Sequence, residues 1–237
     1  MGNCTECVAW SSDFLVSSKS VVVAVLTRAP SSGGKTRLFK TLGREPDPQL
    51  AEALLLDTLE AIELSGLQRV VCFTPPEAEE ELRSLVPCEV PLICQQDGDL
   101  GDRMQAVFND LLSQDIHGVI VLGSDLPLLS PGVLQEAEKL LYKDPDVVLL
   151  GPATDGGYYL LGATRTPIAL LKGITWGVST VLEETLARAR TAKISVQLMA
   201  KTCDVDSPDD LMRVVRASHG GYRTRDWAVR HGIISDS

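Results

Sequence analysis

The feature that most constrains the fold is a short apolar run that ends in an acidic turn. Residues 119–122 read Val-Ile-Val-Leu between Gly118 and Gly123, and the run is too short for a helix. We therefore expect a strand that is buried on both faces, as strands of parallel sheets are. Pro127 prevents the strand from continuing. Asp125 is then expected at the carboxyl end of a central strand, where open α/β sheets bind ligands.

Strands and helices are predicted to alternate along the chain around this run. Apolar runs predict strands at residues 21–26, 70–73, 90–94, 119–122, 147–150, 158–161 and 195–199. Helical spacing or capping residues predict helices at 49–65, 77–85, 99–112, 131–142 and 180–190, and one that starts at 207–208. This alternation is typical of a three-layer α/β fold with a mostly parallel sheet.

One domain is expected, because no composition shift or repeat marks a linker. Residues 1–18 are interpreted as a disordered extension, residues 19–217 as the domain and residues 218–237 as a basic tail. The arginines at 213–230 are expected to be solvated, with contact to an anionic acceptor or a partner subunit as the alternative.

Charge and cysteine content exclude several classes of function. The formal charge of −10 argues against nucleic-acid binding and against docking on an anionic membrane. No apolar run reaches the roughly 18 residues that a membrane span needs, and no signal peptide is recognised. Four of the six cysteines are scattered among predicted strands and loops, which suits a reducing compartment, so a cytoplasmic protein is expected. Cys4 and Cys7 form a lone pair, which is too few ligands for a zinc site.

A glycine-rich basic loop follows the first predicted strand. It contains Gly-Lys-Thr at residues 34–36, but Ala29 replaces the first glycine of a P-loop and Pro30 removes a backbone donor. A looser contact with a diphosphate remains an interpretation, beside that of a flexible surface loop. The residues expected to bind donor phosphates are Arg28, Gly33, Gly34, Lys35 and Arg37.

Two acidic positions are separated in sequence but could meet in space. Asp125 ends the central strand, and Asp204 and Asp206 lie between the last predicted strand and the last helix. Paired carboxylates commonly hold Mg²⁺ or Mn²⁺ beside phosphates. Alternatively, Asp125 and Asp204 are turn residues and Asp206 caps a helix, and spacing alone does not decide between these interpretations.

The segment Asp155-Gly156-Gly157-Tyr158 suggests either a hairpin turn or a backbone that approaches a ligand. Trp176 follows in a chain with few aromatic residues. Its default role is in the core, and the sharper hypothesis is that it lines a sugar or base pocket.

Taken in order, six motifs resemble those of the DUF2064 family, whose members are often called rSAM/selenodomain-associated transferase 1 or arsenosugar-biosynthesis glycosyltransferases. The motifs lie at residues 34–38, 98–104, 123–127, 151–158, 176–177 and 204–211, and the resemblance extends over residues 21–217. It implies a GT-A fold, the architecture of nucleotide-diphospho-sugar transferases. More distantly, the chain is similar to nucleotidyltransferases that make the molybdenum cofactor and F420.

The resemblance implies that Asp125 and Asp206 hold Mg²⁺ or Mn²⁺ and that Lys35 and Arg37 contact phosphates. It also implies a nucleotide-sugar or nucleoside-triphosphate donor and a small-molecule acceptor. One departure concerns the Asp-x-Asp motif of many GT-A glycosyltransferases, because Gly123 stands where its first acid would be. In this respect the chain is closer to the nucleotidyltransferases.

The expected function is that of a metal-dependent transferase with a nucleotide-linked donor. Glycosyl transfer is the leading hypothesis because of the family label. Nucleotidyl transfer is the alternative, followed by a P-loop phosphotransferase and an inactive GT-A-like binding domain. Asp125 and Asp155 are the expected catalytic residues. The expected acceptor or sugar pocket comprises Asp155, Gly156, Gly157, Tyr158 and Trp176.

Overall fold

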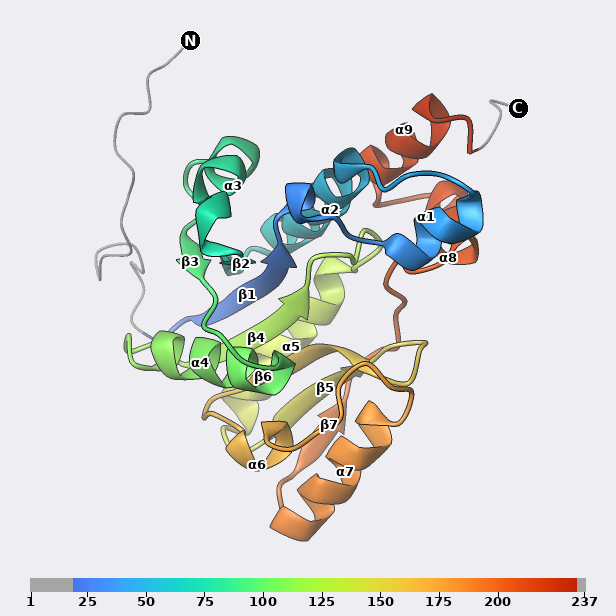
Figure 1. Ribbon diagram of the computed structural model, residues 1–237. Coiled ribbons are helices and arrows are strands. Elements are labelled where there is room, and N and C mark those ends of the chain that lie inside the picture. The colour runs from blue at the N-terminus through green and yellow to red at the C-terminus, as the bar shows by residue number, and fades with distance from the viewer. Residues whose placement is uncertain (1–18, 234–237) are drawn as a thin grey trace.

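The computed structural model describes residues 19–233. Its centre is a sheet of seven strands in the order β3-β2-β1-β4-β6-β5-β7 (Figure 1). The strands are β1 (Val21–Arg28), β2 (Gln68–Thr74), β3 (Leu92–Cys94), β4 (Gly118–Gly123), β5 (Val148–Pro152), β6 (Tyr158–Ala163) and β7 (Val196–Leu198). The predicted extension at 1–18, with Cys4 and Cys7, lies outside the described residues.

The expected parallel sheet is confirmed, with one exception. Strand β1 pairs in parallel with both β2 and β4, and β5 pairs in parallel with β7. Strand β6 runs antiparallel to both of its neighbours, β4 and β5. Strands β5 and β6 therefore form a hairpin, and the hairpin interpretation of the segment around Asp155 is confirmed.

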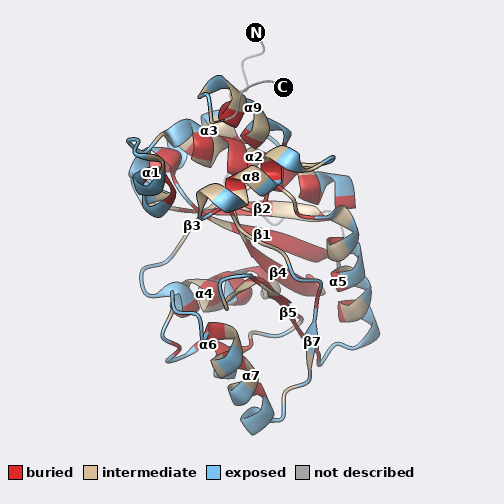
Figure 2. Ribbon diagram, turned by 90° about the vertical axis from the view of Figure 1, so that its right-hand side faces the viewer, coloured by how far each residue is buried: buried red, intermediate tan, exposed pale blue. Residues whose placement is uncertain are grey.

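Helices cover both faces of the sheet, because successive residues of the central strands point to opposite sides. Val23 of β1 packs in one core cluster with residues of α2 (Pro48–Ser65), α3 (Glu79–Leu85) and α5 (Pro131–Lys143). Val22 packs in the other cluster with residues of α4 (Leu100–Leu112), α6 (Ile168–Leu171) and α7 (Val181–Ala192). Figure 2 shows the central strands buried between these layers.

A third core cluster lies beyond the carboxyl ends of the central strands. It joins α1 (Thr36–Leu42), α2, α8 (Pro208–Arg216) and α9 (Tyr222–Arg230), which lie together in Figure 1. Trp227 of α9 is 1% exposed and stands edge-on to Phe39 of α1. Residues 222–230 were predicted as part of a solvated basic tail. They instead form a packed helix, because Trp227 and Ala228 bury apolar side chains in the third core cluster.

Helix starts follow the capping residues in the sequence. Helix α8 begins after Ser207, whose hydroxyl accepts from the amide of Asp210 while the Asp210 carboxylate accepts from the amide of Ser207. The glycine-rich basic loop predicted after the first strand contains regular structure, because a 3₁₀ turn covers Pro30–Ser32 and α1 begins at Thr36. Within residues 19–233, no helix combines the length and the apolar character needed to cross a membrane.

Candidate active site

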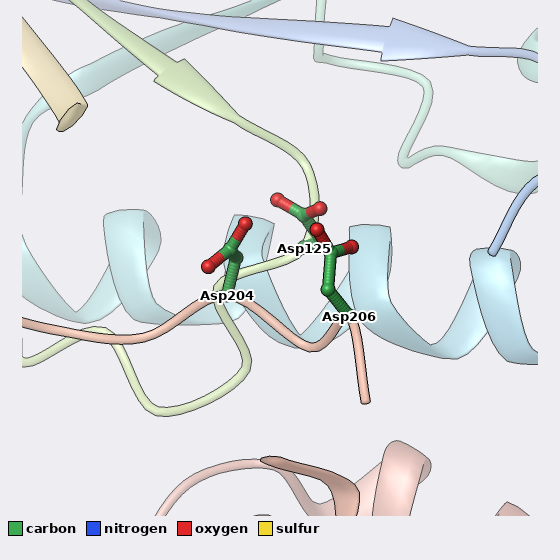
Figure 3. A group of neighbouring side chains, drawn as sticks. All are labelled: Asp125, Asp204 and Asp206. Carbon is green, nitrogen blue, oxygen red and sulfur yellow. The ribbon is translucent and has the colours of Figure 1, made fainter. Parts of the chain in front are cut away.

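Three carboxylates gather beyond the carboxyl end of β4. Asp125 follows β4, and Asp204 and Asp206 lie in the loop between β7 and α8. One carboxylate oxygen from each residue lies within 4.8 Å of the others, and Figure 3 shows the three side chains side by side. The amide of Val205 donates to the carbonyl of Asp125 at 3.2 Å, which fixes the two segments to each other. We call Asp125, Asp204 and Asp206 the acidic cluster.

Asp204 is not among the metal ligands expected from the sequence, and the structure places it with the other two acids. The sequence does carry a signal for it. Residues two apart in an extended segment point to the same side, so Asp204 and Asp206 are candidates to act together. The interpretation of Asp206 as a helix cap is wrong, because Ser207 caps α8.

Lys35 lies against the acidic cluster. Its Nζ donates to Asp125 Oδ2 and, at 2.7 Å, to Asp206 Oδ1. Lys35 occupies the N-cap position of α1 in a left-handed conformation, with φ of 55°. Burial lowers the pKa of Lys35, but the charges of both aspartates and the hydrogen bonds to them raise it, and the net shift is upward. The ammonium group therefore stays charged and partly neutralises the cluster.

The electrostatics of Asp204 reflect crowding of like charges. Burial, followed by the charges of Asp125 and Asp206, raises the pKa of Asp204 to about 6. The chemistry of the cluster suits a hard divalent cation, because Mg²⁺ and Mn²⁺ prefer carboxylate oxygens. Side-chain exposure of 27% for Asp125 and 47% for Asp206 leaves the cluster open to ligands from solvent.

Two cavities adjoin the acidic cluster, and Asp125 lines both. The first, of about 310 Å³, is lined by Asp206 and by residues of the loop after β1, and we call it the basic cavity. The phosphate-binding candidates Arg28, Gly33, Gly34 and Lys35 line it. Arg37 is exposed on α1 and is not among its lining residues.

The second cavity, of about 300 Å³, is lined by Asp204 and by residues of the β5–β6 hairpin, α4 and the start of α7. We call it the aromatic cavity, because Tyr158 and Trp176 line it with their rings edge to face and centroids 6.2 Å apart. Burial raises the pKa of the Tyr158 hydroxyl. Leu100 and Met104 of α4 also line it. Neither was among the pocket residues expected from the sequence, although both lie within the motif at residues 98–104.

The predicted Asp-Gly-Gly pocket residues divide into two groups. Asp155 and Gly157 line the aromatic cavity, and Asp155 Oδ1 accepts from the amide of Gly157 at 2.8 Å, which stabilises the turn. Gly156 is not among the lining residues. It has φ of +94°, and a Cβ there would lie 2.0 Å from the carbonyl oxygen of Ser179. The need for glycine at 156 comes from packing of the hairpin against the start of α7.

Comparison with known proteins assigns this chain to a family. The model of the family described as "Uncharacterized protein conserved in bacteria (DUF2064)" matches residues 57–178, more than half of the chain. The chain is 29% identical to the 2-phospho-L-lactate guanylyltransferase of Haloarcula marismortui, over 86% of this chain and 90% of that protein. It is 28% identical to the 3-phospho-D-glycerate guanylyltransferase of Phenylobacterium zucineum, over 83% of this chain and 91% of that protein.

A solved structure shares the fold over nearly the whole chain. It is that of a candidate nucleotide-diphospho-sugar transferase from Desulfovibrio desulfuricans G20. The TM-score is 0.78 at 25% identity, with 89% of this chain and 95% of that chain covered. The expected GT-A-like three-layer fold is thereby confirmed. On the family match and the activities of its relatives, the chain belongs to the DUF2064 family and is a transferase.

Proposed function

We propose that this DUF2064 protein transfers a nucleotidyl group from a nucleoside triphosphate to a small-molecule acceptor and releases pyrophosphate. The observation that carries the proposal is the position of the acidic cluster between two cavities, of which, among the described residues, only one is lined by a lysine and an arginine. The basic cavity would take the triphosphate and the aromatic cavity the acceptor. Both ligands would then meet at Asp125, which lines the two cavities.

Asp125 and Asp206 are the proposed ligands of one Mg²⁺ or Mn²⁺, with Asp204 as a third. Their oxygen atoms lie close enough together to share an ion, and all three are hard ligands. When bound, the ion would supply positive charge that holds the phosphates and offsets the charge developing on pyrophosphate.

The loop after β1 would bind the triphosphate. Lys35 and Arg28 contribute cations to the basic cavity, and Gly33 and Gly34 allow the backbone to approach closely. An oxygen of the acceptor would form a bond to the α-phosphorus. The bond from that phosphorus to the bridging oxygen would break, and pyrophosphate would leave with the electron pair. Catalysis would consist mostly of positioning and charge stabilisation.

Asp155 is proposed to orient the acceptor or to accept its proton. It lines the aromatic cavity and uses Oδ1 to hold the turn. Within the described residues, Oδ2 has no hydrogen-bond or ion-pair partner, so this oxygen is available to a ligand.

Nucleotidyl transfer is preferred over the glycosyl transfer that the family label favoured. Relatives that match more than four-fifths of the chain are guanylyltransferases. The basic cavity and the single acid after β4 agree with a triphosphate donor. Glycosyl transfer is the second candidate, because of the sugar-transferase description of the Desulfovibrio protein.

The test measures thermal stability with each of four nucleoside triphosphates and with UDP- and GDP-sugars, with and without Mg²⁺ or Mn²⁺. A triphosphate at about 100 times its dissociation constant should stabilise the wild type by about 2.7 kcal/mol, and only with metal. Asp125→Asn should abolish this effect. The matched control is Asp146→Asn, which removes a carboxylate from an exposed pair with Arg165 and should behave as wild type.

The outcomes separate the candidates. Stabilisation by a sugar nucleotide alone would replace nucleotidyl with glycosyl transfer. An unchanged response in Asp125→Asn would overturn the metal assignment. No response to any nucleotide would leave an inactive binding domain as the better description.

A further inference from the structure

All the charged residues that line the aromatic cavity, among those the structure describes, are negatively charged. The charged residues that line the aromatic cavity are Asp125, Asp155 and Asp204, and among the described residues no lysine, arginine or histidine lines it. Lys35 and Arg28 line the basic cavity instead, and Lys35 is already paired with Asp125 and Asp206. Apart from the metal ion proposed at the acidic cluster, a carboxylate in the aromatic cavity would therefore meet like charges without a cation to pair with.

Helix N-termini do not replace the missing cations. Helices α4 and α7 both begin at the aromatic cavity, and backbone amides at such positions can bind anions. In α4 the amide of Asp102 is already bound by the carboxylate of Asp99. In α7 the first turn carries Glu183 and Glu184, whose charges oppose an incoming anion.

Tyr158 and Trp176 expose carbon atoms, and not their polar atoms, to a ligand in this cavity. The Tyr158 hydroxyl oxygen and Trp176 Nε1 each have less than 1 Å² of accessible surface. The parts of these two side chains that can touch a ligand are thus carbon atoms. Leu100, Met104 and Val178 add further apolar lining. Accessible polar side chains in the aromatic cavity are therefore carboxylates, which accept hydrogen bonds from hydroxyl or amino groups.

We propose that the body of the acceptor, beyond the atom that reacts, is apolar, carries a hydroxyl or amino group and has no carboxylate. This inference rests on the proposed function, because it takes the aromatic cavity as the acceptor site. It separates this chain from the two relatives named above, whose substrates are phosphorylated carboxylic acids. Beyond the proposed metal ion, carboxylate recognition would need a cation that the described residues lining this cavity do not supply, so the selectivity comes from unpaired charge as well as from apolar contact.

The experiment compares three probes that share a phenyl ring and carry a neutral, a cationic or an anionic polar group: benzyl alcohol, benzylamine and benzoate. Binding to the full chain is measured by ligand-observed NMR without nucleotide. Benzyl alcohol and benzylamine should bind, and benzoate should bind at least about tenfold more weakly, equivalent to about 1.4 kcal/mol. Val178→Trp, at an exposed lining position, should block the bound probes. Ile168→Trp, equally exposed on α6 outside the lining, should leave binding unchanged.

A second arm measures pyrophosphate release from GTP with Mg²⁺. 3-Phospho-D-glycerate is compared with sn-glycerol 1-phosphate, which has the same configuration and a hydroxymethyl group in place of the carboxylate. Any turnover with glycerol 1-phosphate should exceed that with phosphoglycerate. Preference for phosphoglycerate, equal or stronger binding of benzoate, or no binding of the three probes would overturn the inference.

Failure of the proposed function gives a different result. Absence of metal-dependent stabilisation by any triphosphate would end the nucleotidyltransferase proposal, and the probe binding would still report the charge preference of the cavity. Conversely, triphosphate stabilisation together with efficient use of phosphoglycerate would retain the function and reject the acceptor class.

Discussion

At the scale of single residues, the ammonium group of Lys35 is the positive charge that balances the carboxylates of the acidic cluster. The ammonium group lies between Asp125 and Asp206, the two residues proposed to hold a divalent ion. Neighbouring carboxylates repel one another without a counter-charge, and Lys35 supplies a positive charge to both. Under the proposed function, a divalent ion at the same oxygens would compete with the ammonium group of Lys35, which would then be free to contact phosphate.

Lys35→Met is predicted to separate these two roles. Mn²⁺ should bind about tenfold more tightly without nucleotide, because the competing charge is gone, while metal-dependent binding of the triphosphate should weaken. Mn²⁺ titration followed by electron paramagnetic resonance measures the first effect and calorimetry the second. Lys40→Met, an exposed position on the same helix, is the control. Weaker Mn²⁺ binding in Lys35→Met would contradict the competition.

The positions of residues in the fold were predictable where local sequence determined them, and the contacts between distant segments were not. The position of Asp125 could be predicted from the strand that precedes it, and the position of Lys35 from the loop after the first strand. The contact between them joins positions 90 residues apart, and no local pattern encodes it. Asp57 shows the same limit: an unpaired aspartate of a surface helix is expected to face solvent, yet Asp57 of α2 is 3% exposed.

At the scale of elements, the β5–β6 hairpin is positioned by its contact with α7. The amide of Leu182 donates to the carbonyl of Gly156 at 3.0 Å, and Gly156 lies against the backbone of Ser179. The sequence predicted the turn from Asp-Gly-Gly. It did not predict the contact with α7, because a close approach between backbones depends on where the helix lies.

Gly156→Ala should lower the free energy of unfolding by about 3 kcal/mol, combining left-handed strain with overpacking against Ser179. Gly232→Ala is the matched control, because Gly232 also has positive φ and a Cβ added there would meet no atom within 4 Å. It should cost about 1 kcal/mol. Urea denaturation measures both, and equal losses would show that packing against α7 contributes nothing.

At the scale of the whole molecule, a buried carboxylate attaches the C-terminal helix to the domain. Asp57 of α2 accepts hydrogen bonds from the amides of Arg223 and Thr224 and from the Thr224 hydroxyl. It therefore satisfies the start of α9, whose Trp227 fills the third core cluster. The arginines of this segment suggested a solvated tail in the sequence. The acidic partner of Arg223, Asp57, lies 166 residues earlier, so no local pattern reveals the contact.

Asp57→Ala is predicted to lower the free energy of unfolding by about 3 kcal/mol, because it leaves several buried donors without a partner. Glu60→Ala removes the exposed pair of Arg223 with Glu60 and should cost less than about 1 kcal/mol. Urea denaturation of both variants measures the difference. Similar losses in the two variants would contradict the role assigned to Asp57.

The third core cluster also has a consequence for the order of events during synthesis. Asp204 and Asp206 follow all seven strands in the sequence, and the helices that support their loop and Lys35 come from both ends of the described chain. Since chains fold as they emerge from the ribosome, the sheet can form before these acids are available. A nascent chain would possess the scaffold while still unable to gather the acidic cluster, and would acquire it only when α8 and α9 dock.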